Sequence, residues 1–295
     1  MCIVRSSKRV DISVIVPHFE QAELLRACLR SLDAQTLAKT DFEVIVVDNN
    51  SSCDLFYIRA AFPSFKFLSE SKQGAAHARN AGIDAARGEN FAFIDADCTA
   101  APDWLENGLK KLGSSPLFGG EIFVTAERPK SPTPVEAFER IFAFHQRTYI
   151  ERKRFSVTAN LFATRATVET IGPFHNGIAE DLEWCHRAAA LGFHLAFNDT
   201  SIVRHPARKT WDELVSKWER LTLERWNGFG GRSLIRRVRW AGLVVATALS
   251  PAPHFVSVLF SNRVSGWKNK IGAATVLLRI RLWRARRMMS LLSPA

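Results

Sequence analysis

The sequence predicts an α/β protein with a Rossmann-like, mostly parallel sheet flanked by helices, followed by a basic helical tail. Three largely apolar runs, at residues 12–16, 42–47 and 91–94, are typical of strands buried on both faces of a sheet. Helical periodicity separates the first two runs, and polar residues follow soon after each run. Since ligands of parallel α/β sheets bind outside the carboxyl ends of the strands, we expect the functional residues there.

The other elements alternate along the chain. An apolar stripe at helical spacing predicts the first helix, at Leu24, Leu25, Cys28, Leu29 and Leu32. Further helices are predicted at 75–86, after Pro102, over 135–145 and at 181–191, where Gly192 ends the helix. Strands are predicted at 65–68, 122–124 and 157–163.

Charge divides the chain into two parts. Of its 295 residues, 40 are Lys or Arg and 29 are Asp or Glu, and twelve of the basic residues but none of the acidic ones lie from Arg232 onward. We therefore expect a nearly neutral catalytic domain at 1–231 and a basic tail at 232–295 that binds an anionic surface. Five scattered cysteines without a CxxC pair, and an N-terminus without a long apolar run, indicate a cytoplasmic protein.

The tail has the composition of a membrane-associated segment. Residues 240–262 carry no charge and are long enough to cross a bilayer, but Pro251 and Pro253 interrupt them. Both flanks are cationic, which favours a surface-lying or re-entrant helical hairpin. Residues 271–292 mix apolar residues with arginines, as interfacial helices on anionic lipid do. We expect a peripheral protein on the inner face of the plasma membrane; the alternative is that these apolar residues pack on the catalytic domain.

Carboxylates stand where sugar transfer needs them. Asp95 and Asp97 follow a strand and point to the same side of an extended segment, so both could reach a nucleotide and a divalent cation bridging its diphosphate. An acceptor hydroxyl must lose its proton as it attacks, and Glu180 and Asp181 at a helix start are the candidates for a general base. Taken singly, each Asp could equally be a turn former or a helix cap.

Five motifs occur in order along the chain: Ser-Val-Ile-Val-Pro-His-Phe-Glu at 13–20, Val-Ile-Val-Val-Asp-Asn-Asn-Ser at 44–51, Gly-Ala-Ala-His-Ala-Arg-Asn-Ala-Gly at 74–82, Phe-Ile-Asp-Ala-Asp at 93–97 and Glu-Asp-Leu-Glu-Trp at 180–184. Together they resemble the family 2 glycosyltransferases of GT-A fold, far more specifically than a lone DxD motif would. The resemblance implies an inverting, metal-assisted transferase that uses a nucleotide-diphospho-sugar, usually a UDP-sugar. With a tail on the membrane, a lipid-linked or cell-envelope glycan acceptor is expected.

The resemblance also implies roles for single residues on the donor side. Pro17 and Glu20 would line the nucleotide pocket, and Asp48 would accept a hydrogen bond from the base. Arg79 would lie near the nucleotide or its phosphates, with Asn80 beside it. Asp95 would contact the ribose.

The metal and acceptor sides are implied in the same way. Asp97 would bind Mg²⁺ or Mn²⁺, and His205, after the following strand, would complete the metal shell. Asp181 would be the general base with Glu180 supporting it, and Asn160 would line the acceptor side. His205 could instead simply close its strand before Pro206.

The chain departs from the family at two places. His18-Phe19-Glu20 stands where many members have a tyrosine and an asparagine, which puts the ribose contacts in doubt. Glu224-Arg225-Trp226 lacks the glutamine of the Gln-x-x-Arg-Trp motif of processive synthases, which favours transfer of a single sugar.

Three rival functions would each account for part of the sequence. A dinucleotide-binding oxidoreductase would need a G-x-G-x-x-G turn after the first strand, where Pro-His-Phe-Glu stands. A nucleic-acid binder is unsupported because the chain has no such motif and its basic residues alternate with apolar ones. A catalytically inactive scaffold that binds sugar nucleotide at the membrane is the remaining alternative.

Overall fold

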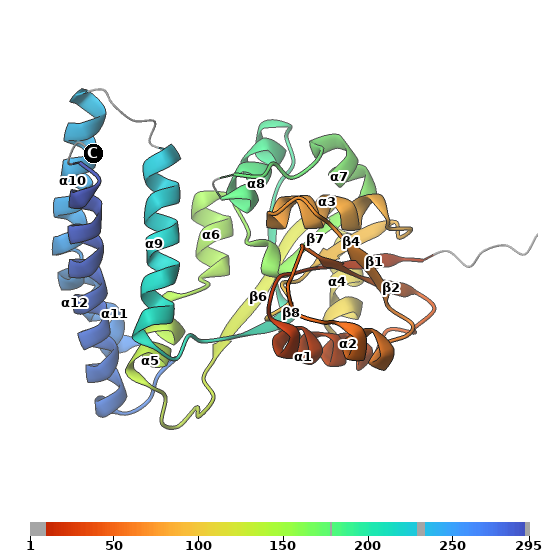
Figure 1. Ribbon diagram of the computed structural model, residues 1–295, viewed down its shortest axis with the longest axis horizontal. Coiled ribbons are helices and arrows are strands. Elements are labelled where there is room, and N and C mark those ends of the chain that lie inside the picture. Colours follow the sequence, from red (N-terminus) through yellow and green to blue (C-terminus); the bar gives the residue numbers. More distant parts are fainter. Residues whose placement is uncertain (1–9, 178, 229–233, 293–295) are drawn as a thin grey trace, which may run out of the picture. The chain divides into compact units, whose positions relative to one another are not determined.

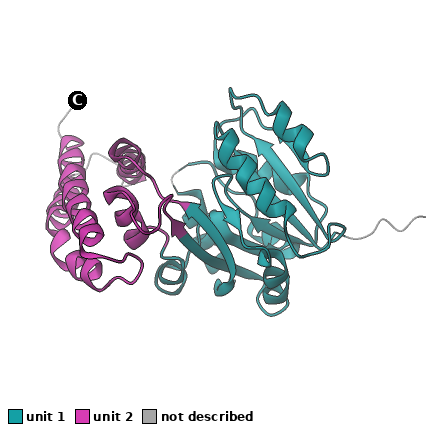
Figure 2. Cartoon of the chain, turned by 90° about the horizontal axis from the view of Figure 1, so that it is seen from below, with its two compact units in different colours: residues 1–123, 145–205 teal, residues 124–144, 206–295 magenta. Residues whose placement is uncertain are grey.

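The computed structural model describes residues 10–177, 179–228 and 234–292 (Figure 1). The chain forms two compact units, unit 1 with residues 1–123 and 145–205, and unit 2 with residues 124–144 and 206–295 (Figure 2). These limits differ from the predicted boundary between 231 and 232, because two earlier segments pack with the tail helices. The predicted division of function at that boundary stays a prediction.

One eight-stranded sheet is formed by the described residues, in the order β3-β2-β1-β4-β7-β6-β8-β5. Strands β1, β2, β3 and β4 pair in parallel, whereas β7 is antiparallel to both β4 and β6, and β5 is antiparallel to β8. The strands are β1 (Ile12–His18), β2 (Phe42–Asp48), β3 (Lys66–Ser69), β4 (Asn90–Phe93), β5 (Thr99–Ala100), β6 (Leu117–Thr125), β7 (Leu161–Thr164) and β8 (Ala196–Pro206).

The parallel register brings the polar residues after the strands to one edge. His18 at the end of β1 lies opposite Asp48 at the end of β2, and Asp48 lies opposite Ser69 of β3. Strand β1 runs two residues beyond the predicted 12–16. Pairing with β4 ends at Ile15, so Pro17 lies where β1 has a neighbour on one side only and its missing N–H costs little.

Helices surround this sheet in unit 1. They are α1 (Ala22–Asp33), α2 (Phe56–Ala61), α3 (Ala75–Asp84), α4 (Trp104–Leu112), α6 (Gln146–Lys153), the short 3₁₀ helix η1 (Thr158–Asn160), α7 (Arg165–Ile171) and α8 (Glu180–Ala190). The predicted stripe on α1 is confirmed for Leu25, Cys28, Leu29 and Leu32, which are fully buried, but not for Leu24, which is 38% exposed. Helix α6 was not predicted, and strand β8 was expected only as the strand that His205 closes.

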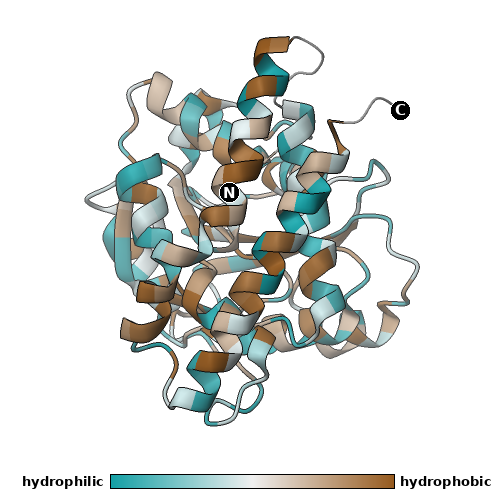
Figure 3. Cartoon of the chain, turned by 90° about the vertical axis from the view of Figure 1, so that its left-hand side faces the viewer, coloured by the Kyte–Doolittle hydropathy of each residue, from teal (hydrophilic) through white to brown (hydrophobic). Residues whose placement is uncertain are grey.

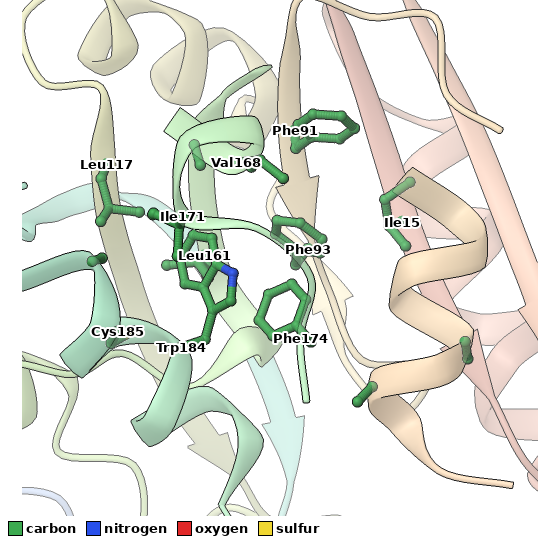
Figure 4. Close-up of a cluster of buried hydrophobic side chains, with 14 of the residues drawn as sticks. Ile15, Phe91, Phe93, Leu117, Leu161, Val168, Ile171, Phe174, Trp184 and Cys185 are labelled. Atoms are coloured by element: carbon green, nitrogen blue, oxygen red, sulfur yellow. The ribbon is translucent and has the colours of Figure 1, made fainter. Parts of the chain in front are cut away.

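The core of unit 1 anchors the elements that carry the candidate site. Side chains of β1, β4, β7 and α8 meet in one buried cluster (Figure 4). Within it Trp184 of α8 stacks on Phe174 with ring centroids 4.9 Å apart, and the Trp184 indole donates to the Gly172 carbonyl at 2.9 Å. The N-terminus of α8, with Glu180 and Asp181, is therefore fixed by a buried aromatic contact one turn further along.

Unit 2 is a group of helices. Its members are α5 (Pro134–Phe142), α9 (Trp211–Gly228), α10 (Leu234–Leu249), α11 (Pro251–Phe260) and α12 (Trp267–Ser290). A capping box between Thr133 and Glu136 starts α5. Buried Glu139 of α5 pairs with Arg208 at 3.1 Å and with Lys217 at 2.7 Å, so its charge is compensated within the unit.

Helix α12 corresponds to the segment predicted to lie on lipid. The helix itself is confirmed, but its apolar face, with Ala273, Val276, Leu277 and Ile280, is buried against α5, α9 and α11. That face is therefore not available to a membrane. Of the two interpretations of the tail, packing within the protein describes α12 better than contact with lipid. The contacts are made to the other helices of unit 2.

Helices α10 and α11 behave differently. Leu234, Val238, Val245 and Leu249 form one exposed stripe along α10, each at least 58% exposed. Among the described residues, one helical stretch, Leu234–Phe260, is long and apolar enough to cross a membrane by length and composition alone. Hydrophobic segments are visible on the helices of unit 2 in Figure 3.

Candidate active site

Arg79 of α3 joins the two acidic motifs of the sequence. Its side chain is 4% exposed, and its two terminal nitrogens donate to Asp95 Oδ1 and to Glu180 Oε1, each at 3.0 Å. Burial alone would lower the pKa of Arg79, but the carboxylates of Asp95 and Glu180 raise it. One buried guanidinium thus ties the end of β4 to the start of α8.

Asp95 is the carboxylate on the strand side of this bridge. Burial raises its pKa against the opposing effect of Arg79, and the neighbouring Asp97 carboxylate raises it further. Arg79 donates its hydrogen bond to Oδ1 of Asp95 and not to Oδ2. The two carboxylates two residues apart are close enough to repel each other, which a cation bound beside them would relieve.

Asp181 lies next to Glu180 on the first turn of α8. Burial and the charge of Glu180 raise the pKa of Asp181 to about 6, while a hydrogen bond from the Leu182 N–H to Oδ1 opposes the shift. A carboxylate with this pKa is largely ionised at pH 7 and is a stronger proton acceptor than an ordinary aspartate. These are the properties that a general base needs.

Asp97 and His205 face each other. Asp97 Oδ2 and His205 Nε2 are 3.1 Å apart, and both side chains are mostly buried. Carboxylate oxygen and imidazole nitrogen are ligands that Mn²⁺ accepts, so the donor set fits a divalent cation. No cluster of three or more His, Cys, Asp or Glu suited to a metal occurs in the described part of the chain. The other ligands would therefore come from a bound diphosphate and water, as is usual for Mg²⁺.

Two buried cysteines support the Asp95–Asp97 turn, a feature that the sequence interpretation missed. Cys98 Sγ donates to Asp97 Oδ1 at 3.6 Å, and Cys28 Sγ donates to the Asp95 carbonyl at 3.8 Å. Burial raises the pKa of both thiols, and the nearby carboxylates raise it further. Both cysteines are free thiols that stay protonated and pack beneath the turn.

Asp48, the predicted partner of the nucleotide base, is held in place by His18. The Gln21 N–H donates to His18 Nε2 at 3.2 Å, which leaves Nδ1 to carry the proton and donate to Asp48 Oδ1, also at 3.2 Å. Although His18 departs from the family pattern, it orients the carboxylate. Its position opposite Asp48 on the neighbouring parallel strand is the signal that could have revealed this.

Glu20 organises the loop after β2. Its carboxylate accepts from the Ser52 N–H at 2.7 Å and the Ser52 hydroxyl at 3.1 Å, and the Glu20 N–H donates to Ser51 Oγ. Pro17 lies in register with Val47, one residue before Asp48. Both residues thus lie close to Asp48, the predicted contact of the nucleotide base. Their part in binding the nucleotide stays a prediction.

Asn80 is held by the backbone of Phe174. It donates to the Phe174 carbonyl at 2.8 Å and accepts from the Phe174 N–H at 2.9 Å. These bonds join α3 to the segment that leads into α8, and so they position Arg79 relative to Glu180. A direct contact of Asn80 with the nucleotide is untested and stays a prediction.

Asn160 is buried and fully bonded. Its Oδ1 accepts from the Trp104 indole at 3.0 Å, and its Nδ2 donates to the Glu121 and Ser201 carbonyls, each at 2.9 Å. With 0% of its surface exposed, it cannot line the acceptor side, so that prediction is wrong. It instead ties β6 to β8, the strand that carries His205.

Comparisons with known proteins agree with this geometry. The profile of "Glycosyl transferase family 2" matches residues 13–169. Glycosyltransferase AglE of Haloferax volcanii is 32% identical over 259 residues, which cover 83% of this chain and 84% of that protein. The amylovoran biosynthesis glycosyltransferase AmsB of Erwinia amylovora is 33% identical over 113 residues, 36% of each chain.

Solved structures show the same fold. The mannosyltransferase PcManGT of Pyrobaculum calidifontis, solved with GDP-Man and Mn²⁺, has a TM-score of 0.52 and 20% identity, over 96% of this chain and 75% of that one. S. aureus TarS 1-349, solved with UDP, has a TM-score of 0.54 and 18% identity, over 95% and 88%. The sheet flanked by helices is accordingly a GT-A fold. This chain belongs to glycosyl transferase family 2 and is a nucleotide-sugar-dependent glycosyltransferase.

Proposed function

We propose that the enzyme transfers a single sugar, with inversion, from a nucleotide-diphospho-sugar to an acceptor hydroxyl, and that the nucleotide is UDP. The observation that carries the proposal is the Arg79 bridge, which brings the Asp95–Asp97 motif and the Glu180–Asp181 pair into one site. An inverting transfer needs a site for the donor and a general base that takes the proton from the acceptor hydroxyl. The Asp95–Asp97 motif supports the first and the Glu180–Asp181 pair supports the second.

On the donor side, Asp97 and His205 would hold Mg²⁺ or Mn²⁺, which neutralises charge on the diphosphate as it leaves. Mn²⁺ in the Pyrobaculum mannosyltransferase complex supports this cation. Asp95 would accept from the ribose, and Asp48, oriented by His18, from the base. The UDP in the TarS complex supports uracil, while the GDP-Man in the mannosyltransferase complex makes guanine the alternative.

On the acceptor side, Asp181 would take the hydroxyl proton. Its pKa of about 6 matches a base that works near neutral pH. Glu180 has a supporting part, because its bond to Arg79 fixes the first turn of α8 while its charge keeps Asp181 basic.

The site of action is proposed to be an anionic membrane, on the inner face of the plasma membrane, with a lipid-linked or cell-envelope glycan acceptor. Support comes from the exposed apolar stripe of α10, from exposed Phe260 of α11, and from cationic residues at both ends of these helices, such as Arg237 and Arg263. A bilayer with anionic headgroups complements this combination of apolar and positive surface. The free state of Cys28, Cys53, Cys98 and Cys185 suits a cytoplasmic protein.

The donor assignment is tested by assaying sugar release and transfer from UDP-sugars with Mn²⁺. Asp97→Asn should lower kcat/KM by about 10²–10³, because the leaving diphosphate loses its cation. Asp103→Asn, which removes an exposed carboxylate with no capping bond, is the matched control. Equal activity of Asp97→Asn and the control would refute the metal site.

The membrane assignment is tested by sedimentation with phosphatidylglycerol vesicles. Replacing Leu234, Val238, Val245 and Leu249 by serine should release the protein into the supernatant, since apolar burial drives interfacial binding. Phe56→Ser, which removes an exposed apolar side chain of unit 1, should change nothing. Unaltered sedimentation of the α10 variant would refute this surface.

A further inference from the structure

Within the described residues, a group of arginines between α9 and α12 has no carboxylate partner. Arg284 of α12 is 7% exposed, and its guanidinium lies 3.7 Å from the centre of the Trp218 ring of α9. Among the described residues, Arg284 Nε has no hydrogen-bond acceptor. Burial, together with the positive charges of Arg281 and Arg225, lowers the pKa of Arg284 to about 9. A buried cation repelled by two others is an expensive arrangement unless an anion joins it.

Other donors beside this group also lack partners. Trp218 Nε1 and Thr222 Oγ1 are buried atoms with no hydrogen-bond partner in the described part of the chain. Trp218, Thr222 and Arg225 recur at spacings of four and three, so they lie along one face of α9. Arg281 and Arg284 are likewise three apart on α12, which packs on α9. Five groups that can donate hydrogen bonds or positive charge thus line one helix pair.

The nearby acidic residues are already engaged. Glu219 receives the Arg287 guanidinium at 2.7 Å, and Glu224 pairs with Arg220 at 2.9 Å. No Asp or Glu follows Glu224 in the sequence. Since these carboxylates have other partners, the neutralising anion is expected from outside the chain.

We propose that the face shared by α9 and α12 binds a phosphate group, through Arg225, Arg281 and Arg284 with the Trp218 indole and Thr222 hydroxyl as further donors. Guanidinium groups match phosphate oxygens in geometry and charge. Several guanidinium groups around one phosphate can each donate two hydrogen bonds to its oxygens. The phosphate can be free in solution or can belong to the headgroup of an acidic phospholipid. The second source fits the exposed α10, which packs on α12 within unit 2. This site is independent of the sugar-nucleotide site.

The experiment uses the full chain and two probes, inorganic phosphate and vesicles of phosphatidic acid in phosphatidylcholine. The test variant is Arg281→Gln with Arg284→Met, and the control is Arg286→Gln with Arg128→Gln, which removes the same charge from exposed positions. For the wild type and the control we expect saturable binding of at least one probe, and for the test variant at least tenfold weaker binding of that probe. Circular dichroism and donor-sugar turnover of the test variant establish that it is folded.

The two probes separate the sources. Loss of inorganic phosphate binding identifies a site for free phosphate, and loss of vesicle binding alone identifies a headgroup site. Phosphate bound at the sugar-nucleotide site would be unaffected by the test variant, so the two proposals can fail separately. Binding of neither probe by the wild type, or equal weakening in test and control variants, would overturn the proposal.

Discussion

Two buried arginines, one in each unit, have opposite surroundings. Arg79 in unit 1 is bonded to two carboxylates, which raise its pKa despite burial. Arg284 in unit 2 lies on a tryptophan ring with two further arginines nearby, and burial lowers its pKa to about 9. The first charge is compensated by the fold and serves to hold a site together. The charge of Arg284 is not compensated by the fold, and we expect a ligand to compensate it.

The largest expected effect comes from breaking the compensated pair. Arg79→Met leaves Asp95 and Glu180 without their cation, so the free energy of unfolding should fall by about 3–5 kcal/mol. Urea denaturation measures this change. Arg87→Met, which removes a 73% exposed arginine paired with Glu43, should cost less than about 1 kcal/mol. Similar values for both variants would show that the Arg79 bridge is not an organising contact.

Asp181 is comparable to Arg284 with the opposite charge, since it is a half-buried carboxylate that the fold leaves incompletely compensated. Because its pKa is about 6 in the folded protein and near 3.8 when unfolded, folding takes up protons between these values, and stability falls as pH rises through this window. Asp181→Asn should therefore be more stable than wild type at pH 7, by up to about 3 kcal/mol, with the difference vanishing near pH 4.

Unfolding in urea at several pH values measures this gain. Asp103→Asn, at an exposed position, should follow the wild type at every pH. A loss of stability in Asp181→Asn at pH 7 would mean that the carboxylate serves as a helix cap and that its ionised form is favoured by the fold.

The smallest expected effect is that of Arg284→Met without ligand. Methionine keeps an unbranched apolar stem against Trp218 and removes an uncompensated charge, so the stability should equal that of wild type or exceed it by about 1 kcal/mol. A thermal melt in phosphate-free buffer measures it. A loss as large as that of Arg79→Met would mean that the fold already compensates Arg284.

The sequence predicted the parallel half of the fold and the edge of the sheet at which the candidate carboxylates lie. Strands β1, β2 and β4 are apolar runs whose carboxyl ends must meet, so Asp48, Asp95 and Asp97 could be placed at one edge from the order of the motifs alone. The Glu180–Asp181 pair was a candidate base from its place at a helix start, but its approach to Arg79 could not be predicted, because it spans 101 positions in sequence.

What could not be predicted depends on long-range packing. Asn160 looks like any polar residue near a strand, and only the approach of Trp104, Glu121 and Ser201 shows that its amide is used up. Helix α12 has the composition of a lipid-bound helix, yet α5 and α9 bury its apolar face, and the exposed stripe lies on α10 instead. An amphipathic pattern in the sequence indicates that one face of a helix is covered. It does not indicate whether protein or lipid covers it.

The central claim, that unit 1 performs base-assisted sugar transfer, is tested most directly by the pH dependence of kcat with saturating donor. For the wild type, kcat should rise with pH up to about 6 and then level off, as Asp181 loses its proton. Asp181→Asn should lower kcat by about 10²–10⁴ and abolish that inflection, with the affinity for the sugar nucleotide unchanged. An inflection that persists in Asp181→Asn, or a donor affinity that falls as far as kcat does, would contradict the account.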